Sequence, residues 1–323
     1  MKWISGASLV LSMQVFLCGA HHALTAQTTV QSDGPPSQVM VWNAANVQHV
    51  YGLPDAKAKD RGTLTVSADG LSFTGKASRS IIPLRSIMAV SAGNERVELW
   101  GVKGRLLRMA IPNGGGLAAA TVMHHKVNML TVEFSDSRGA YHGAVFVLST
   151  NEANHAVQSF ARMPVIHREL PNSVCESGVV RPRTVLVAAP NWDQVQVPAA
   201  YRALMYEHLI ERLRHSKEID RVYRDGEIDP QQGCPQYTVH LSITGFKAGS
   251  QVARAATGPV GMFAGTTQMM FDTTITDASG KLNLHEQTKS TVRGESESIN
   301  VADGVAKKLT KQFSEAQKKV GRT

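Results

Sequence analysis

The sequence is poor in cysteine and lacks the short motifs that carry common catalytic chemistry. Only three of its 323 residues are cysteines. Neither Cys175 nor Cys234 has a Cys-x-x-Cys partner or a nearby histidine, which argues against a zinc site. We find no Gly-x-Ser-x-Gly elbow, no His-Glu-x-x-His helix, no P-loop and no dinucleotide fingerprint. The sequence therefore gives no catalytic, cofactor or metal site, and we expect a protein that is not an enzyme.

Long apolar runs are also absent, and the longest one lies at the start of the chain. Lys2 precedes an apolar stretch that is interrupted by Ser and Gln, and small residues follow up to Ala26. This order is typical of a secretory signal peptide, and the stretch is too short for a retained membrane span. Cys18 follows the large Leu17, which argues against lipid anchoring. We predict a periplasmic or secreted protein whose mature chain begins near Gln27 and has no transmembrane span.

Dense clusters of one charge are missing as well. The formal net charge is +8, but the basic residues are dispersed, and the densest groups are Lys307 with Lys308 and Lys318 with Lys319. A solvated helix face explains these pairs, so we do not expect nucleic-acid binding.

Two cysteines remain after removal of the signal peptide, and they allow one disulfide. An oxidising compartment favours a bond between Cys175 and Cys234, although two buried free thiols are the alternative. Each cysteine precedes a predicted strand. The bond requires Cα atoms within about 7 Å, so the two strands must be parallel neighbours or their lead-ins must fold back.

The first half of the chain predicts short strands followed by one helix. Period-two alternation and turn residues indicate strands, and a capping box at Ser149 and Glu152 starts a helix whose apolar face includes Phe160. The predicted strands are 63–66, 71–73, 80–83, 87–90, 96–100, 106–111, 129–134 and 141–148.

This half resembles short bacterial versions of the pleckstrin-homology-like domain. The resemblance rests on the strand order, on a first turn with Asp69 and Gly70, and on a strand with Ile82 and Pro83. It implies a β-barrel closed by a C-terminal helix.

The second half predicts the order β-α-β-β-β-β-α, which is typical of an α+β layer with helices on one face of a mostly antiparallel sheet. We expect a helix over 198–215 and a terminal helix marked by Val301, Val305, Leu309 and Phe313. The acidic pair Asp225 and Glu227, beside Gly226, is interpreted as a solvated turn. The remaining predicted strands are 184–188, 221–224, 236–246, 269–276 and 281–292.

The second half also resembles a bacterial exported family of unknown function that includes many lipoproteins. It is similar to the α/β domains of the TolB N-terminus and of curli-secretion assembly factors. The resemblance is strongest at Gly249, Ser250 and Arg254, and it continues into a glycine-rich run. The family implies no established catalytic chemistry.

The glycine-rich run is the predicted partner contact, because it combines glycine with soft apolar side chains that a partner would cover. A plain hairpin connection and membrane insertion are the two alternatives, and the run is too short to span a bilayer. The predicted contact residues are Gly258, Gly261, Met262, Phe263 and Gly265.

These patterns predict an exported, non-catalytic module that binds or assembles with an envelope protein, with sheet-edge pairing as the other mode of contact. A lipid or small-ligand carrier that uses the barrel mouth is the alternative, and a hydrolase is the third hypothesis. The predicted organisation is a signal peptide (1–26), a flexible lead-in (27–41), a pleckstrin-homology-like domain (42–163), a linker (164–173) and an α/β domain (174–323).

Overall fold

The computed structural model describes residues 40–98, 124–148, 152–161, 179–192, 195–227, 233–249, 265–292 and 299–320. The structure separates Met1–Ser37 from Gln38–Thr323, and both sheets belong to the second unit. The predicted signal peptide and the predicted linker (164–173) lie outside the described residues, so these two predictions and the domain boundaries stay predictions.

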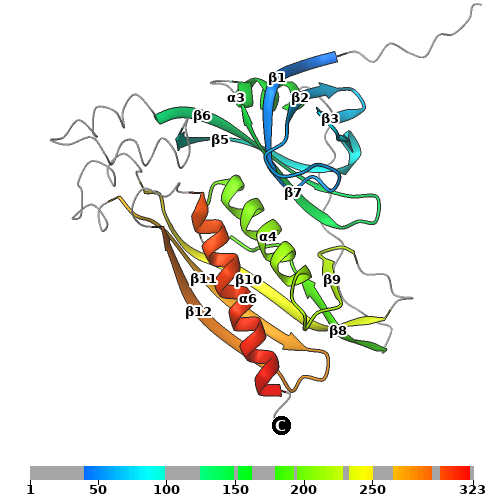
Figure 1. The fold of residues 1–323 in the computed structure, drawn as a ribbon, viewed down its shortest axis with the longest axis vertical. Coiled ribbons are helices and arrows are strands. Elements are labelled where there is room, and N and C mark those ends of the chain that lie inside the picture. The colour runs from blue at the N-terminus through cyan, green and yellow to red at the C-terminus, as the bar shows by residue number, and fades with distance from the viewer. Residues whose placement is uncertain are drawn as a thin grey trace, which may run out of the picture. The chain divides into compact units, whose positions relative to one another are not determined.

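The first sheet is antiparallel throughout and has the strand order β4-β3-β2-β1-β7-β6-β5 (Figure 1). A 3-10 turn, η1 (Leu84–Ser86), joins β4 to β5. The strands are β1 (Met40–Tyr51), β2 (Arg61–Ser67), β3 (Gly70–Gly75), β4 (Arg79–Pro83), β5 (Ile87–Glu98), β6 (His124–Ser135) and β7 (Tyr141–Leu148).

Alternating side chains of this sheet form a core of their own. In β2, Leu64 and Val66 are fully buried while their neighbours are half-buried, as the period-two pattern predicts. Helix α3 (Glu152–Ala161) covers this core with Ala153, Ala156 and Phe160, which confirms the predicted apolar face.

Two features of the first sheet differ from the predictions. Strand β1 was not predicted, although it pairs with both β2 and β7. The prediction of a separate strand from Arg96 is wrong, because β5 continues through Gly93 and Arg96 pairs with Lys126 of β6. Gly93 pairs with Met129 of β6 without a register shift, so this glycine does not interrupt the strand.

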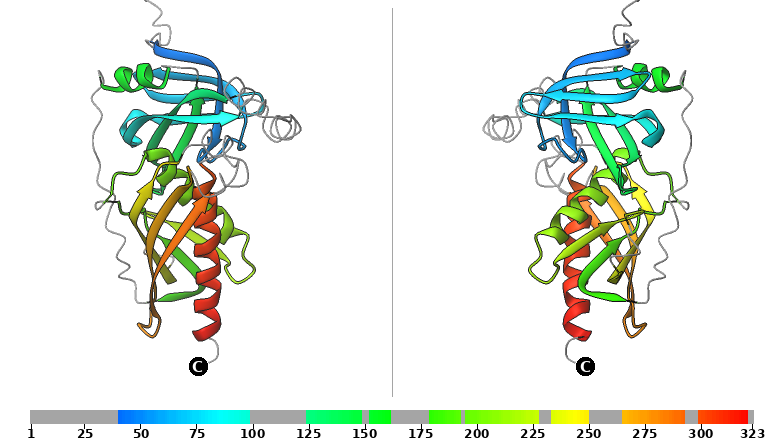
Figure 2. Two further views of the ribbon diagram at one scale, coloured as in Figure 1. Left: turned by 90° about the vertical axis from the view of Figure 1, so that its left-hand side faces the viewer. Right: turned by 90° about the vertical axis from the view of Figure 1, so that its right-hand side faces the viewer.

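The second sheet has the strand order β12-β11-β10-β8-β9, and α4 and α6 lie on one face of it (Figure 1 and Figure 2). Strand β8 is parallel to both neighbours, and the other pairings are antiparallel. The parallel pairing of β8 with β9 follows from the crossover through α4. The elements are β8 (Val180–Val187), α4 (Ala199–Arg214), β9 (Arg221–Arg224), β10 (Cys234–Lys247), β11 (Thr267–Asp277), β12 (Asn283–Val292) and α6 (Asn300–Val320).

The second core confirms the apolar stripe that was predicted for the terminal helix. Val301, Val305, Leu309 and Phe313 of α6 are all buried and pack with α4 and the sheet. The coarse α+β class is therefore observed. Within the part of the chain that the structure describes, no helix is long and apolar enough to cross a membrane.

Candidate functional site

Helix α4 is buried on nearly all sides, because it packs against both sheets. Twelve of its 16 residues are buried, including the charged Arg202 and Glu207. The helix contacts β7 of the first sheet. A Cβ at Gly143 of β7 would lie 2.5 Å from the Cβ of Ala203 on the helix. Gly143 therefore permits the close approach. The helix expected over 198–215 is confirmed, and the burial of the charged Arg202 and Glu207 was not predicted.

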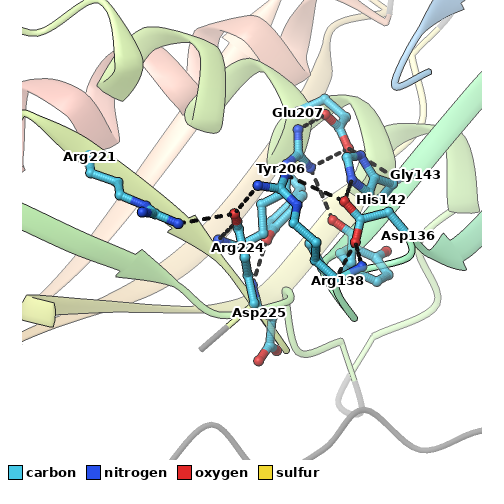
Figure 3. A network of polar contacts seen from close by, with 12 residues as sticks. Asp136, Arg138, His142, Gly143, Tyr206, Glu207, Arg221, Arg224 and Asp225 are labelled. Atoms are coloured by element: carbon cyan, nitrogen blue, oxygen red, sulfur yellow. Dashed lines mark hydrogen bonds and ion pairs between the residues drawn. The ribbon is translucent and has the colours of Figure 1, made fainter. Parts of the chain in front are cut away.

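The centre of this contact is a buried ion pair between α4 and β9 (Figure 3). Arg224 donates to both carboxylate oxygens of Glu207, over 2.9 and 2.6 Å. The backbone N–H of Gly143 donates to the same carboxylate over 3.0 Å, and Arg224 also donates to the carbonyl of Tyr141 over 3.0 Å. The side chains of Glu207 and Arg224 are 2% and 5% exposed, so the pair is shielded from water on both sides. The pair thus ties α4 and β9 to the start of β7.

The turn between β6 and β7 adds a second acidic group to the network. Asp136 accepts hydrogen bonds from the backbone N–H groups of Arg138, over 2.8 Å, and Ala140, over 3.0 Å, and it lies 3.4 Å from Nε2 of His142. Burial by itself would raise the pKa of Asp136, but these hydrogen bonds outweigh it and hold the pKa below its usual range. Asp136 is therefore a stable anion that closes the turn.

The interpretation of Asp225 and Glu227 as a solvated turn is wrong. Asp225 accepts a hydrogen bond from the backbone N–H of Ala189, over 2.8 Å. Glu227 is 8% exposed and accepts from the backbone N–H of Arg224 over 3.0 Å, and it also pairs with Arg138 over 3.2 Å. The local Gly226 turn is real, but it packs against the β6–β7 turn, which leaves Asp225 and Gly226 half-buried and Glu227 buried.

A second charged pair lies at the start of α4. Arg202 donates to Glu133 of β6 over 3.2 Å and to the carbonyl of Val197 over 2.6 Å. Burial raises the pKa of Glu133, and the guanidinium of Arg202 opposes that shift without cancelling it. The guanidinium also stacks over the Trp192 ring, 3.7 Å from its centroid.

The carboxylates of this network are held by hydrogen bonds and ion pairs. Both oxygens of Glu207 accept hydrogen bonds from Arg224, so this carboxylate is not free to act as a general base. Among the residues that the structure describes, no group of three or more His, Cys, Asp or Glu side chains is placed to hold a metal ion. The arrangement can fix the two sheets to each other, and it offers no nucleophile with a base beside it.

An aromatic pocket lies beside the start of α4. It has a volume of 830 Å³ and is lined by Trp192, Val197, Arg202 and Phe246, among others. Trp192 is half-buried, and the Phe246 ring packs 4.9 Å from the Tyr201 ring. We call this surface the Trp192 pocket. No motif in the sequence pointed to the Trp192 pocket. The available signal was a tryptophan shortly after the end of a buried strand, at the edge where loops commonly form binding sites.

Two of the predicted site residues meet at the adjoining ends of β10 and β11. A Cβ at Gly249 would lie 2.3 Å from the carbonyl oxygen of Gly265, so only glycine fits there. Gly265 itself has a φ of 65°. Together they form a narrow neck at which residues 250–264 leave and rejoin the sheet. The other predicted residues of these two sets, Ser250, Arg254, Gly258, Gly261, Met262 and Phe263, lie outside the described residues.

The predicted disulfide depends on strand geometry that the structure partly describes. Strands β8 and β10 are parallel neighbours, with Cys234 at the start of β10 opposite Val180 at the start of β8. This is the arrangement that the prediction required. Cys175 lies outside the described residues, so its bond with Cys234 stays a prediction.

One histidine lies on α4 and another follows its last residue. His215 is the C-terminal capping residue, and its Nδ1 lies 2.8 Å from the carbonyl oxygen of Glu211. His208 is half-buried and packs on the Tyr51 ring at 4.8 Å, and burial lowers its pKa.

Comparisons with known proteins do not identify a family for this α+β protein. No protein-family model and no curated protein match the chain. Among solved structures, the PelC dodecamer from Paraburkholderia phytofirmans matches with 16% identity over 41% of this chain and 88% of that chain, at a TM-score of 0.29. A variant of the same PelC matches with 18% identity over 41% and 89% of the two chains, at a TM-score of 0.27. TM-scores below 0.5 do not show that this chain shares the fold or the function of PelC.

Proposed function

We propose that this protein is an exported, non-catalytic module that binds an envelope protein through the Trp192 pocket. The observation that carries the proposal is the pocket itself, which combines a half-buried tryptophan, a phenylalanine and a stacked arginine. Tryptophan and arginine in a desolvated pocket are the residues that most often dominate the binding energy of protein interfaces. The neck at Gly249 and Gly265 lies at the adjoining ends of β10 and β11, and the proposed contact residues 258–263 come between these two glycines in the sequence.

The charged network supports a binding role rather than a catalytic one. Its carboxylates are engaged in hydrogen bonds that join α4 to both sheets, so they hold the pocket's floor in place. A binding site that is already rigid loses less conformational entropy when the partner docks.

We also propose that the first sheet and α3 form a pleckstrin-homology-like domain. The support is a meander of four strands followed by one of three, with a helix that packs on the core at the end. Strands β4 and β5 are not paired in the described residues, so the sheet is open at that point.

Site-specific crosslinking in the native envelope tests the proposed contact. A photo-reactive amino acid at Gln196, an exposed residue of the pocket, should give one dominant crosslinked protein. The same probe at the exposed Lys76 of the first sheet's surface is the control. Trp192→Ala should abolish the Gln196 crosslink because it removes the aromatic anchor, while the exposed Ile81→Ala should leave it unchanged. Equal crosslinking from Gln196 and Lys76 would contradict the proposal.

A small-ligand or lipid carrier is the second candidate, and one cavity favours it. This cavity has a volume of 620 Å³, lies at the open side of the first sheet and is lined in part by Leu53, Ile82 and Phe134. The exposed Ile81 lies at its rim with 57% of its surface accessible. Mass spectrometry of the purified protein should then reveal a bound lipid that Ile81→Asp removes. Protein free of any bound organic molecule would reject this candidate.

A further inference from the structure

A groove between β12 and α6 gathers lysine side chains that the proposed function does not use. Its volume is 910 Å³, and Lys289, Lys307, Lys308 and Lys311 line it together with Ser290 and Gly304. Figure 1 shows α6 running alongside this half of the sheet, and α6 contacts both β11 and β12. We call this surface the lysine groove.

The groove exists because α6 approaches β12 closely. A Cβ at Gly304 would lie 2.6 Å from the hydroxyl oxygen of Ser290, so a larger residue would push the helix away from the strand. Lys307, Lys308 and Lys311 follow Gly304 at spacings of three, four and seven residues, which places them on the same side of the helix. The glycine therefore brings a row of lysines to the strand edge.

One of these lysines is held in place by the strand. The ammonium group of Lys308 donates a hydrogen bond to the backbone carbonyl of Lys289. This contact holds the charge of Lys308 over the edge of β12, next to Lys289, whose side chain carries a second positive charge. An ammonium held in position loses less side-chain entropy on binding an anion than a free one does.

The charges of the groove are not balanced by acidic groups of the protein. Among the described residues, Lys289, Lys307 and Lys308 form no ion pair, and Lys311 pairs only with the exposed Glu315, over 3.7 Å. The nearby Asp303 is already bound by Arg212, over 2.7 Å. The three lysines without a counter-ion repel one another and Lys311, and an anion in the groove relieves that repulsion.

We propose that the lysine groove binds a phosphate-bearing anion. Lysine acts as a point charge that suits phosphate, whereas flat carboxylates favour the planar fork of arginine, which this groove lacks. The hydroxyl groups of Thr266, Ser290 and Thr291 supply further donors. The phosphate belongs either to a soluble polyanion or to the headgroup of an anionic phospholipid. This proposal is independent of the Trp192 pocket.

Two binding assays on the full chain test the proposal and separate the two sources. Isothermal titration uses tripolyphosphate, with citrate as a carboxylate of similar charge, and co-sedimentation uses phosphatidylglycerol vesicles against phosphatidylcholine vesicles. The test variant combines Lys307→Gln, Lys308→Gln and Lys311→Gln. The matched control replaces the exposed Lys76, Lys217 and Lys281 by Gln and so removes the same charge elsewhere.

We expect the test variant to weaken binding about tenfold or more, and the control to stay within about twofold, because each exposed ammonium–phosphate contact contributes modestly. Binding of tripolyphosphate with this dependence assigns a soluble ligand, and binding of phosphatidylglycerol vesicles alone assigns a lipid headgroup. Three results would overturn the proposal: no binding of either probe, equal loss in both variants, or citrate and phosphatidylcholine bound as tightly as the phosphate probes.

Discussion

Removal of Glu207 should destabilise the protein more than any exposed substitution, because it leaves a buried charge without a partner. The variant Glu207→Ala deletes both bonds to Arg224 and the acceptor of the Gly143 N–H. Arg224 is 4% exposed, so the folded state leaves its charge little access to water. Breaking one side of a buried pair typically costs about 3–5 kcal/mol, which is a large part of the stability of an ordinary domain.

The matched control removes both charges together. Glu207→Met combined with Arg224→Met leaves no unpaired ion and fills a similar volume, so most of the lost stability should return. A double-mutant cycle of Glu207→Met, Arg224→Met and the double variant then gives a coupling energy of about 2 kcal/mol or more between the two sites. The single variant Arg224→Met should resemble Glu207→Ala, since it leaves the carboxylate buried and uncompensated.

Urea unfolding followed by tryptophan fluorescence measures these changes in each sheet separately. Trp42 lies in β1 and Trp192 follows β8, so single-tryptophan forms of the protein report on the two regions in turn. Because α4 packs on both sheets, Glu207→Ala should lower both transition midpoints by the same amount. A loss below about 1 kcal/mol, or a double variant as unstable as the single one, would refute the reasoning.

Three further predictions follow from the described contacts. The pKa of Asp136 is lower in the folded than in the unfolded protein, so the carboxylate stabilises the fold above about pH 4 and this stabilisation is lost as the pH falls further. Asp136→Asn should therefore lower the free energy of unfolding by about 1 kcal/mol at pH 7 and by progressively less towards pH 3. Urea unfolding at each pH measures the difference. Gly249→Val should lower the melting temperature, because the added Cβ would collide with the backbone. Gly280→Ala should lower the melting temperature less, because its Cβ would meet open space, although Gly280 has a positive φ. Equal decreases in melting temperature for the two variants would contradict this prediction. Thiol titration of the denatured, unreduced protein should find no free thiol at Cys175 and Cys234, and two free thiols would reject the bond.

Elements whose own sequence contains a clear period were predictable. Leu64 and Val66 of β2 alternate with more exposed residues, and Val301, Val305 and Leu309 of α6 repeat at four-residue spacing. Each of these elements has one buried face, so its pattern can be read without knowledge of its partner. The same holds for α3, whose cap and apolar face adjoin each other in the sequence.

Strand β1 was missed because bulges break its alternation. Its pairing with β2 shifts register between Met40 and Trp42 and again between Ala44 and Val47, and Asn46 adopts a φ of 57°. A bulge changes which side chains face the core, so no single period of two fits the strand. The register can be assigned only when β2 and β7 are both in place.

The charged residues of the candidate site could not be found from local pattern, because the elements that bury them are distant in the sequence. Arg202 and Glu207 lie on an ordinary helix. Their partners, Glu133 of β6 and Gly143 of β7, lie 69 and 64 residues earlier in the sequence. Arg224 gave no signal either, since its partner lies on a different element. A charged residue in a mostly apolar helix can be solvated or paired, and the sequence alone does not say which.

The buried pair also has a consequence for how the two sheets fit together. Replacing such a pair with apolar residues of similar size is often neutral for stability, so the pair itself need not add to the free energy of folding. What it does constrain is geometry, because Glu207 is satisfied only when Arg224 and the N–H of Gly143 reach it together. A shift of α4 by one turn along β7 would separate all three groups and leave two buried ions unpaired. The close fit of Gly143 against Ala203 and the ion pair therefore both depend on one register between α4, β7 and β9.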